Sequence, residues 1–246
     1  MGNMERPHNN PLKESGTASG NLLLEALPRE EYDRLSPHLE FIRLAPGKIV
    51  YNVGEVVRYA YFPTGGMLSL LATTEAGRII EVGMVGNEGM AGMPAILRNG
   101  VAPYQVTVQL DFHGFRISGA VLREAFRRGG RLQDLLLRYV NTLLVQITQS
   151  AACNRFHTVE ERLCRWLLIC HDRVPTDTIH LTQEFVSHML GVPRSSVTAV
   201  ASVLQDRQVI RYSRGKITVV DRQRLKAASC ECYNLVRKEF TQFLSA

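Results

Sequence analysis

The chain has 246 residues, more than a typical single domain, so we expect two domains that each bury a core. Its hydrophobic content of 45% and charged content of 21% exclude a fibrous or wholly disordered protein, and no apolar run approaches the roughly 20 residues of a membrane span. The net charge is +6, and residues 191–226 alone hold eight cations against two acids, which is typical of a phosphate-binding surface or of an ordinary solvated face.

The first twenty residues are polar and are expected to form a flexible arm. They contain no apolar stretch followed by a small-residue cleavage site, so no secretory signal is visible and we expect the protein in the cytoplasm. Residues 21–39 follow as short helical pieces around Pro28 and Pro37.

From residue 41 to residue 117 the chain changes to short β-branched and aromatic runs. Turn residues such as Gly65 and Gly66 separate them, and the runs cover 48–53, 59–62, 67–72, 78–84, 105–110 and 115–117. Many short strands at this spacing predict an all-β sandwich or jelly roll. A short helix over 121–128, capped by Ser118 and ended by a glycine pair, closes a first domain over residues 21–130.

A long helix is predicted from residue 131 to about residue 156, because this stretch contains neither proline nor glycine. The helix has two apolar stripes. The first has the spacing of a coiled-coil seam and is expected to form a homodimer interface, with burial inside one chain as the alternative. Its apolar members are Leu132, Leu136, Val140, Leu143, Ile147 and Ala151. The second stripe, which includes Leu137 and Leu144, is expected to pack on the β-domain.

Thr158 and Glu161 have the spacing of a capping box, which marks the start of a new helix. This helix spans about residues 159–171 and ends before Pro175. We therefore place the domain boundary near His157, with a dimerisation helix over residues 131–157 and a second domain over residues 158–246.

Residues 181–220 predict two short helices followed by a hairpin. Thr182 caps the first helix, Gly191 forms the turn, and Pro193 opens a second helix over residues 194–206. Two short helices joined by a glycine-containing turn are a helix-turn-helix, and the hairpin over residues 209–220 would be its wing. The chain as a whole is therefore expected to be α+β, with a jelly roll, a long helix and a winged helix-turn-helix.

The second of these helices begins with small polar side chains beside one arginine. A helix that enters the major groove requires such a start, because bulk would prevent close approach. DNA contacts are expected from Arg194, Ser195, Ser196 and Thr198 on the helix, and from Tyr212, Arg214 and Lys216 on the hairpin. A surface ion pair is the alternative for Arg194.

The five cysteines are odd in number and contain no C-x-x-C pair, so no disulfide framework is predicted. Cys230 and Cys232 are candidate metal ligands together with histidines of the chain, but their spacing fits no zinc pattern, and buried reduced thiols are favoured over a metal site. No nucleophile elbow, phosphate-binding loop, zinc-protease motif or dinucleotide fingerprint is present, so an enzyme is not expected.

Taken together, these motifs resemble the cyclic-AMP receptor/Fnr (Crp/Fnr) superfamily of bacterial transcription regulators. The resemblance begins near Asn21 and implies that the jelly roll is of the cyclic-nucleotide-binding type, that Arg194 reads a guanine and that Thr182 contacts the DNA backbone. Ser195 and Ala199 stand where well-known members have Glu and a second Arg, so the preferred operator should differ. The family pattern is present as Leu181-Thr182, Glu184, Leu190-Gly191, Arg194, Val197, Leu204 and Ile210.

The same resemblance implies a homodimer on a pseudo-palindromic operator in double-stranded DNA, with two recognition helices about 34 Å apart. RNA polymerase is a candidate partner, and no membrane is expected. The alternative is a signalling or adaptor protein whose β-domain binds a ligand or partner without specific DNA binding.

An effector site is implied in the glycine-rich stretch 86–92, with Glu88 and Gly89 as candidate ligand contacts and Thr148 as a third on the long helix. The Arg-Ser or Arg-Thr pair that clasps a cyclic phosphate in nucleotide-binding members falls here at Ala102 and Pro103, which disfavours cyclic AMP. Arg98 is the nearest cation, at the wrong offset.

No cysteine precedes Cys153, so the iron–sulfur cluster of the Fnr branch is not expected. No cofactor is assigned, and a haem, another small molecule or no ligand remain open.

Overall fold

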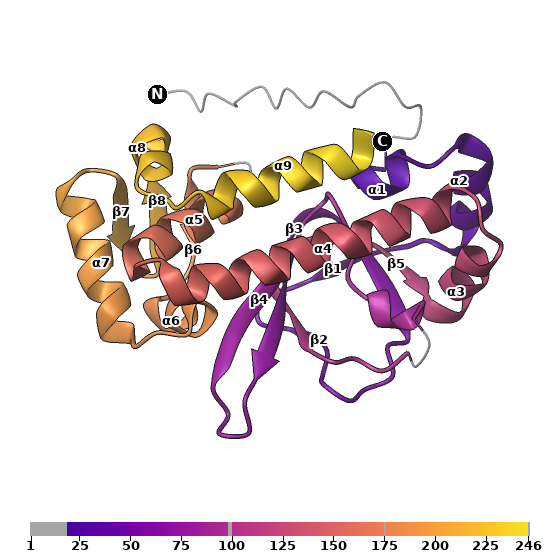
Figure 1. Ribbon diagram of the computed structural model, residues 1–246, viewed down its shortest axis with the longest axis horizontal. Coiled ribbons are helices and arrows are strands. Elements are labelled where there is room, and N and C mark those ends of the chain that lie inside the picture. The colour runs from indigo at the N-terminus through magenta and orange to yellow at the C-terminus, as the bar shows by residue number, and fades with distance from the viewer. Residues whose placement is uncertain (1–18, 98–99, 175, 246) are drawn as a thin grey trace.

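Two halves of the chain lie side by side against one long helix (Figure 1). The computed structural model describes residues 19–97, 100–174 and 176–245, so the predicted arm, except for residues 19 and 20, and Arg98 lie outside the described residues. No helix within the described ranges is long and apolar enough to cross a membrane.

The N-terminal half is an antiparallel sheet preceded by short helices. The strands follow the order β1-β5-β3-β4, and β2 also pairs with β5. This jelly roll-like sheet confirms the predicted fold class. The elements are α1 (Leu22–Glu25), α2 (Arg29–Leu35), the 3-10 helix η1 (Ser36–His38), β1 (Glu40–Leu44), β2 (Ile49–Tyr51), β3 (Tyr59–Thr73), β4 (Ile79–Val85), the 3-10 helix η2 (Met93–Ala95) and β5 (Gln105–Ser118).

Strand β3 is longer than predicted, because its glycine pair bends the strand and does not end it. The pairing of β3 with β5 shifts register on both sides of Gly65, and Gly66 has a φ of 76°. A Cβ atom at Gly66 would lie 2.0 Å from the carbonyl oxygen of Asp111 on β5. The two glycines thus allow two backbones to approach closely at a bulge, where the sequence suggested a turn.

Helix α3 (Gly119–Arg127) leads into the long helix α4 (Arg131–Phe156), as predicted. The burial of the two apolar stripes of α4 is opposite to that expected. Leu136 and Leu143, with exposed fractions of 0% and 7%, lie in the core of the same chain, and Val140 and Ile147 pack half-buried against that core.

Leu137 and Leu144 are instead 53% and 59% exposed. The expectation that Leu136 and Leu143 lie in the dimer seam is therefore wrong, and Val140 and Ile147 have only part of their surface left for a partner. The core of the N-terminal half, to which the β-sheet and α9 contribute, covers the stripe with more apolar side chains, because burying more apolar area releases more free energy. The remaining exposed face of α4 contains Leu137, Asn141, Leu144, Thr148 and Ala151.

The C-terminal half combines helices with a small antiparallel sheet in the order β6-β8-β7. Strand β6 was not predicted, because it contains a single apolar residue, Ile179, and no alternation can be recognised in three residues. The elements are α5 (Val159–His171), β6 (Thr178–His180), α6 (Gln183–Leu190), α7 (Arg194–Asp206), β7 (Ile210–Ser213), β8 (Lys216–Val219), α8 (Arg222–Ala227) and α9 (Cys232–Ser245).

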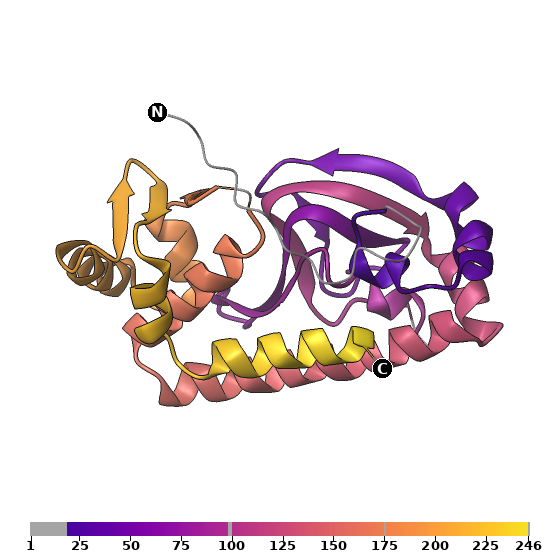
Figure 2. The ribbon, with the colours of Figure 1, turned by 90° about the horizontal axis from the view of Figure 1, so that it is seen from above.

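The last helix, α9, returns from the C-terminal half and runs back along α4 (Figures 1 and 2). Val236, Phe240 and Phe243 belong to the core of the N-terminal half. The ring of Phe243 lies 5.9 Å from that of Tyr139 on α4, centroid to centroid. The end of the chain is therefore packed against the first half of the protein.

A buried polar network joins the two halves. The indole Nε1 of Trp166 on α5 donates a hydrogen bond of 2.8 Å to Glu81 on β4, and the hydroxyl of Ser69 on β3 lies 2.5 Å from the other Glu81 oxygen. Ser69 also bonds to the side-chain oxygen of Gln109 on β5. Burial raises the pKa of Glu81 to about 7, although its hydrogen bonds and the charges of Arg165 and Arg173 oppose that rise.

Candidate functional site

Helices α6 and α7 form the predicted helix-turn-helix, and local signals in the sequence account for its geometry. The Thr182 side chain accepts a 3.1 Å hydrogen bond from the backbone N–H of Phe185, which caps α6. Gly191 ends the helix with a φ of 61°, a left-handed conformation that glycine adopts without strain. Pro193 precedes α7, and α7 spans the predicted residues 194–206.

One face of α7 is buried and the other is open. Val197, Ala201 and Leu204 are buried in the core of the C-terminal half. On the open face, Arg194, Ser195 and Thr198 are exposed and Ser196 is half-buried. The Thr198 hydroxyl lies 2.9 Å from the side-chain oxygen of Gln183, which ties α7 to the start of α6. The open face therefore has the uncluttered start that was expected.

Strands β7 and β8 form the predicted hairpin. Its two-residue turn consists of Arg214 and Gly215, both with positive φ, at 48° and 75°. This is the backbone conformation of the tight turns that favour hairpins. Arg214 and Lys216 are exposed at the tip. Tyr212 is half-buried, and its hydroxyl donates a hydrogen bond of 3.2 Å to the Leu181 carbonyl, so this predicted DNA contact has a structural role within the chain.

The fold brings the expected DNA contacts together on one surface. The Leu181 backbone N–H donates a 2.8 Å hydrogen bond to the Gly215 carbonyl oxygen, so the cap of α6 lies against the wing turn. Burial raises the pKa of the Tyr212 hydroxyl, and the positive charge of Arg194 opposes this rise, as expected if the start of α7 lies near the wing. We call this surface, formed by Thr182, Arg194, Ser195, Ser196, Thr198, Arg214 and Lys216, the cationic face.

Ion pairs within the chain divide the eight cations of residues 191–226 into two groups. Three are held by acids at 2.6 to 3.4 Å: Arg222 by Asp172, Arg207 by Glu160 and Arg224 by Asp221. The other five form no ion pair with any residue that the structure describes: Arg194, Arg211, Arg214, Lys216 and Lys226. Of these, Arg194, Arg214 and Lys216 lie on the cationic face and are available to phosphates or bases.

The glycine-rich stretch, residues 86–92, is closed by side chains from other elements. We call it the sensor loop. Glu88 forms an ion pair with Arg173, which follows α5 in the C-terminal half, and both side chains are 12% exposed. The Gly86 N–H donates a 3.1 Å hydrogen bond to Glu88. Glu88 was expected to bind a ligand, and in this structure it links the sensor loop to the C-terminal half.

The other expected ligand contacts lie apart from Glu88. Gly89 is covered by Tyr139, whose hydroxyl donates a 2.9 Å hydrogen bond to the Met90 carbonyl. Thr148 is exposed on the outward face of α4. Ala102, at the position of the phosphate-clasping pair, is buried, and its N–H donates a hydrogen bond to the carbonyl oxygen of Glu55. Within the chain, Thr148 therefore does not lie with Glu88 and Gly89 in one site.

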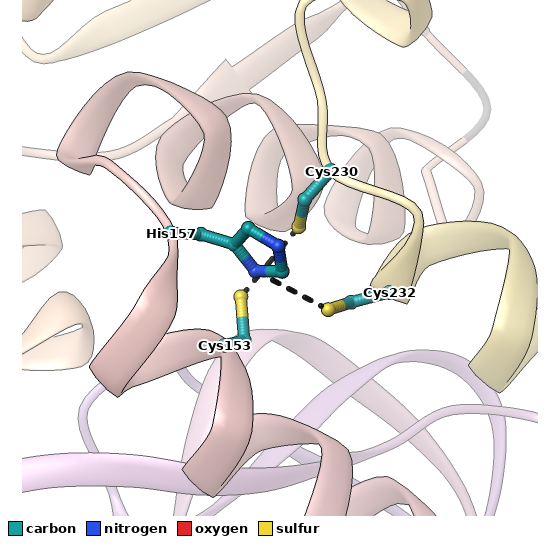
Figure 3. Close-up of side chains that lie close together, drawn as sticks. All are labelled: Cys153, His157, Cys230 and Cys232. Carbon is teal, nitrogen blue, oxygen red and sulfur yellow. Dashed lines mark hydrogen bonds between the residues drawn. The ribbon is translucent and has the colours of Figure 1, made fainter.

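Sequence reasoning missed a group of cysteines that the fold brings together. Cys153, His157, Cys230 and Cys232 converge where α4 ends and α9 begins (Figure 3). The spacing rules for zinc motifs did not reveal the group, because 77 residues separate Cys153 from Cys230. The signals that were present are the four-residue step from Cys153 to His157 and the C-x-C step to Cys232.

Two family models match separate parts of the chain. One describes a Crp-like helix-turn-helix domain and matches residues 161–228. The other describes a cyclic nucleotide-binding domain and matches residues 41–128. The first match contains the whole cationic face, and the second contains the sensor loop.

Known proteins are similar to the chain over most of its length, at low sequence identity. The global nitrogen regulator of Nostoc sp. (strain PCC 7120 / SAG 25.82 / UTEX 2576) is 21% identical over 182 residues, which are 70% of this chain and 81% of that protein. The structure of FixK2 from Bradyrhizobium japonicum has a TM-score of 0.66 at 16% identity, covering 78% of this chain and 98% of FixK2. The c-di-GMP responsive regulator CLP of Xanthomonas campestris has a TM-score of 0.63 at 16% identity, covering 79% of this chain and all 100% of CLP. The structural similarity establishes the fold.

Proposed function

Because the chain belongs to the Crp/Fnr family of DNA-binding transcription regulators, we propose that it binds a pseudo-palindromic DNA site as a homodimer under the control of a small molecule. The observation that carries the proposal is the cationic face, where Arg194 is exposed beside the wing and forms no ion pair with a described residue. In such a regulator, residues 21–130 would form the sensor domain, residues 131–157 the dimerisation helix and residues 158–246 the DNA-binding domain. No catalytic step is part of it.

The cationic face supports a division of labour between base reading and phosphate binding. Arg194 begins α7 and is flanked by the small side chains of Ser195 and Ser196, so its guanidinium can reach a base edge in the major groove, where arginine pairs with guanine in two hydrogen bonds. Arg214 and Lys216 lie at the wing tip, where they would contact phosphates. Thr182 at the start of α6 would contact the DNA backbone.

The exposed face of α4 supports dimerisation. Leu137, Leu144 and Ala151 are spaced by seven residues and are all exposed, which is the pattern of a coiled-coil seam. Thr148 lies on the same face, so it would meet the partner subunit or a ligand near it. A second copy related by twofold symmetry would present two α7 helices to successive turns of the major groove, about 34 Å apart.

The ion pair between Glu88 and Arg173 supports a route for control. It joins the sensor loop to the DNA-binding domain, and both groups are nearly buried. An effector that took Glu88 as a hydrogen-bond partner would release Arg173 and shift the population of DNA-binding geometries. Cyclic AMP is disfavoured because Ala102 and Pro103 replace the phosphate-clasping pair, whereas a cyclic dinucleotide is a candidate in view of the c-di-GMP responsive relative. RNA polymerase remains a proposed partner on the promoter.

Selection of an operator from random duplexes, followed by anisotropy titrations over a range of salt concentrations, tests the proposal. Arg194→Ala should lose about 1 to 3 kcal/mol on the selected operator and much less on random DNA. Arg207→Ala is the matched control, because Arg207 is an exposed arginine of the same domain already paired with Glu160. An equal loss on the operator and on random DNA would remove Arg194 from base reading.

A further inference from the structure

We propose that Cys153, His157, Cys230 and Cys232 bind one zinc ion, which fastens the end of α4 to the start of α9 (Figure 3). This inference does not depend on the proposed DNA-binding function, since it concerns a separate cluster of side chains. Three cysteines and one histidine are a common ligand set of structural zinc sites, which are closed by four protein ligands.

The distances between the ligand atoms fit a tetrahedral ion. The Cys153 and Cys230 sulfurs are 3.6 Å apart, and the Cys232 sulfur lies 3.5 Å from Nδ1 of His157. All four ligand atoms lie within 4.8 Å of one another. Zinc–sulfur bonds of about 2.3 Å and zinc–nitrogen bonds of about 2.0 Å place tetrahedral ligand atoms roughly 3.5 to 3.8 Å apart. The side chains therefore need only small adjustments to enclose a single ion.

The fold brings these ligands together from two segments that are far apart in the sequence, the end of α4 and the start of α9. Cys153 and His157 lie one helical turn apart at the end of α4, where the His157 N–H donates a 3.1 Å hydrogen bond to the Cys153 carbonyl oxygen. Cys230 lies in the link between α8 and α9, and Cys232 is the first residue of α9. All three cysteines are buried, so solvent does not compete for their sulfurs.

A second layer of polar groups is already oriented for metal binding. Nε2 of His157 lies 3.2 Å from the Glu231 carboxylate, which leaves Nδ1 directed at the sulfurs. A carboxylate behind the distal nitrogen of a histidine is typical of zinc sites, where it fixes the tautomer and the ring orientation. The side-chain amide of Gln149 donates a 3.0 Å hydrogen bond to the Cys232 sulfur, a contact suited to a thiolate.

Two buried arginines provide the charge that such a site requires. Three thiolates exceed the charge of Zn²⁺ by one negative charge, and this excess needs a partner in a buried place. Arg162 and Arg165 are 7% and 5% exposed, and Nε of both and Nη1 of Arg165 have no hydrogen-bond partner among the described residues. Both arginines interact electrostatically with Cys153. An anionic zinc site would balance cations that are otherwise costly to bury.

Other chemistry explains the cluster less well. A disulfide between Cys153 and Cys230 would leave Cys232, His157 and the Glu231 contact without a role. An iron–sulfur cluster contains several metal atoms and needs its ligands spread farther apart than these four. Zinc binding uses every member, and the displaced thiol protons pass to the solvent. The ion would restrain the link between α4 and α5, because it ties His157 to the segment that joins α8 to α9.

Metal analysis of the purified full chain tests the proposal directly. We expect about one zinc per chain, released when a mercurial reagent titrates the thiols and read with a chromophoric chelator. Replacement by Co²⁺ should give the visible d–d bands and the thiolate-to-cobalt charge-transfer bands of a tetrahedral site. Both measurements use the wild-type protein, so they do not depend on a variant that folds.

Variants separate the four ligands from other thiols. Cys230→Ser and His157→Gln should lose the stoichiometric metal, whereas Cys164→Ala, which removes a buried cysteine outside the cluster, should keep it. Glu231→Gln should bind metal about 10- to 100-fold more weakly in chelator competition. Wild-type protein that contains no stoichiometric metal and shows no cobalt spectrum, with its three cluster thiols reduced or with a Cys153–Cys230 disulfide, would overturn the proposal.

Discussion

Glu81→Gln should remove a pH dependence of stability that is built into the contact between the two halves. Glu81 is 6% exposed, and burial raises its pKa to about 7 from an ordinary value of 4.5. The Ser69 hydroxyl has one proton but lies against two acceptors, on Glu81 and Gln109. A protonated Glu81 resolves this conflict, because it donates to Ser69 while Ser69 donates to Gln109.

The magnitude follows from the difference between the folded and unfolded pKa values. Between pH 4.5 and pH 7 the folded protein holds a proton that the unfolded chain has lost, so the contribution of Glu81 to stability is full below pH 4.5 and is lost as the pH rises through 7. The difference corresponds to roughly 3 kcal/mol at most. Glutamine keeps the volume and both hydrogen bonds, but it has no proton to lose.

Urea unfolding at a series of pH values, followed by the fluorescence of the only tryptophan, Trp166, measures this effect at its source. The variant and wild type should have similar free energies of unfolding near pH 4.5, and the variant should be more stable by up to about 3 kcal/mol at pH 8. Glu30→Gln, at an exposed carboxylate, is the control. If the free energies of unfolding of Glu81→Gln and wild type changed in parallel with pH, the reasoning would be refuted. All other titrating groups are present in both proteins, so their effects cancel in the difference between the two free energies.

Three further changes test the interface, the coupling and the wing. Leu144→Glu should convert the dimer to a monomer in sedimentation measurements, because it puts charges on the exposed seam of α4. Leu235→Glu, at an exposed leucine of α9, is the control and should leave the dimer intact. A Leu144→Glu protein that is still dimeric would place the interface elsewhere. Arg173→Gln should break the ion pair with Glu88 and change the operator affinity in the absence of effector by about 5-fold or more, as in other coupled sites, and an unchanged affinity would exclude this link as a route of control. Lys216→Ala should lower operator and random DNA binding alike and reduce the salt slope by about 1, and selective loss on the operator would contradict its assignment to phosphate.

The helix-turn-helix could be read from the sequence because its determinants are local. The cap at Thr182, the left-handed turn at Gly191 and the helix start after Pro193 each depend on neighbours within four residues. The spacing of apolar side chains along α7 identified its buried face, and hence the exposed Arg194. The same reasoning predicted α4 and the capping box at Thr158, which the structure confirms.

Tertiary structure decided the features that depend on partners far apart in the chain. A stripe of leucines shows that a helix face is apolar but not what covers it. The sequence therefore predicted the wrong burial for both Leu136, which is buried in the core, and Leu144, which is exposed. Gly65 and Gly66 in the middle of β3 indicated an unusual backbone conformation in the sequence. Only the pairing of β3 with β5 shows that they form a bulge and not a turn.

The cysteine cluster and the Glu88–Arg173 pair depend on tertiary structure in the same way. Their members are 77 and 85 residues apart, and no pattern along the chain specifies which side chains meet at that separation. Sequence alone determined the local elements, the charged segment and the DNA-binding motif, because hydrogen bonds and periodicity within a few residues determine them. The fold decided which of the remaining groups became neighbours, because burial of the two cores brings distant segments to one place.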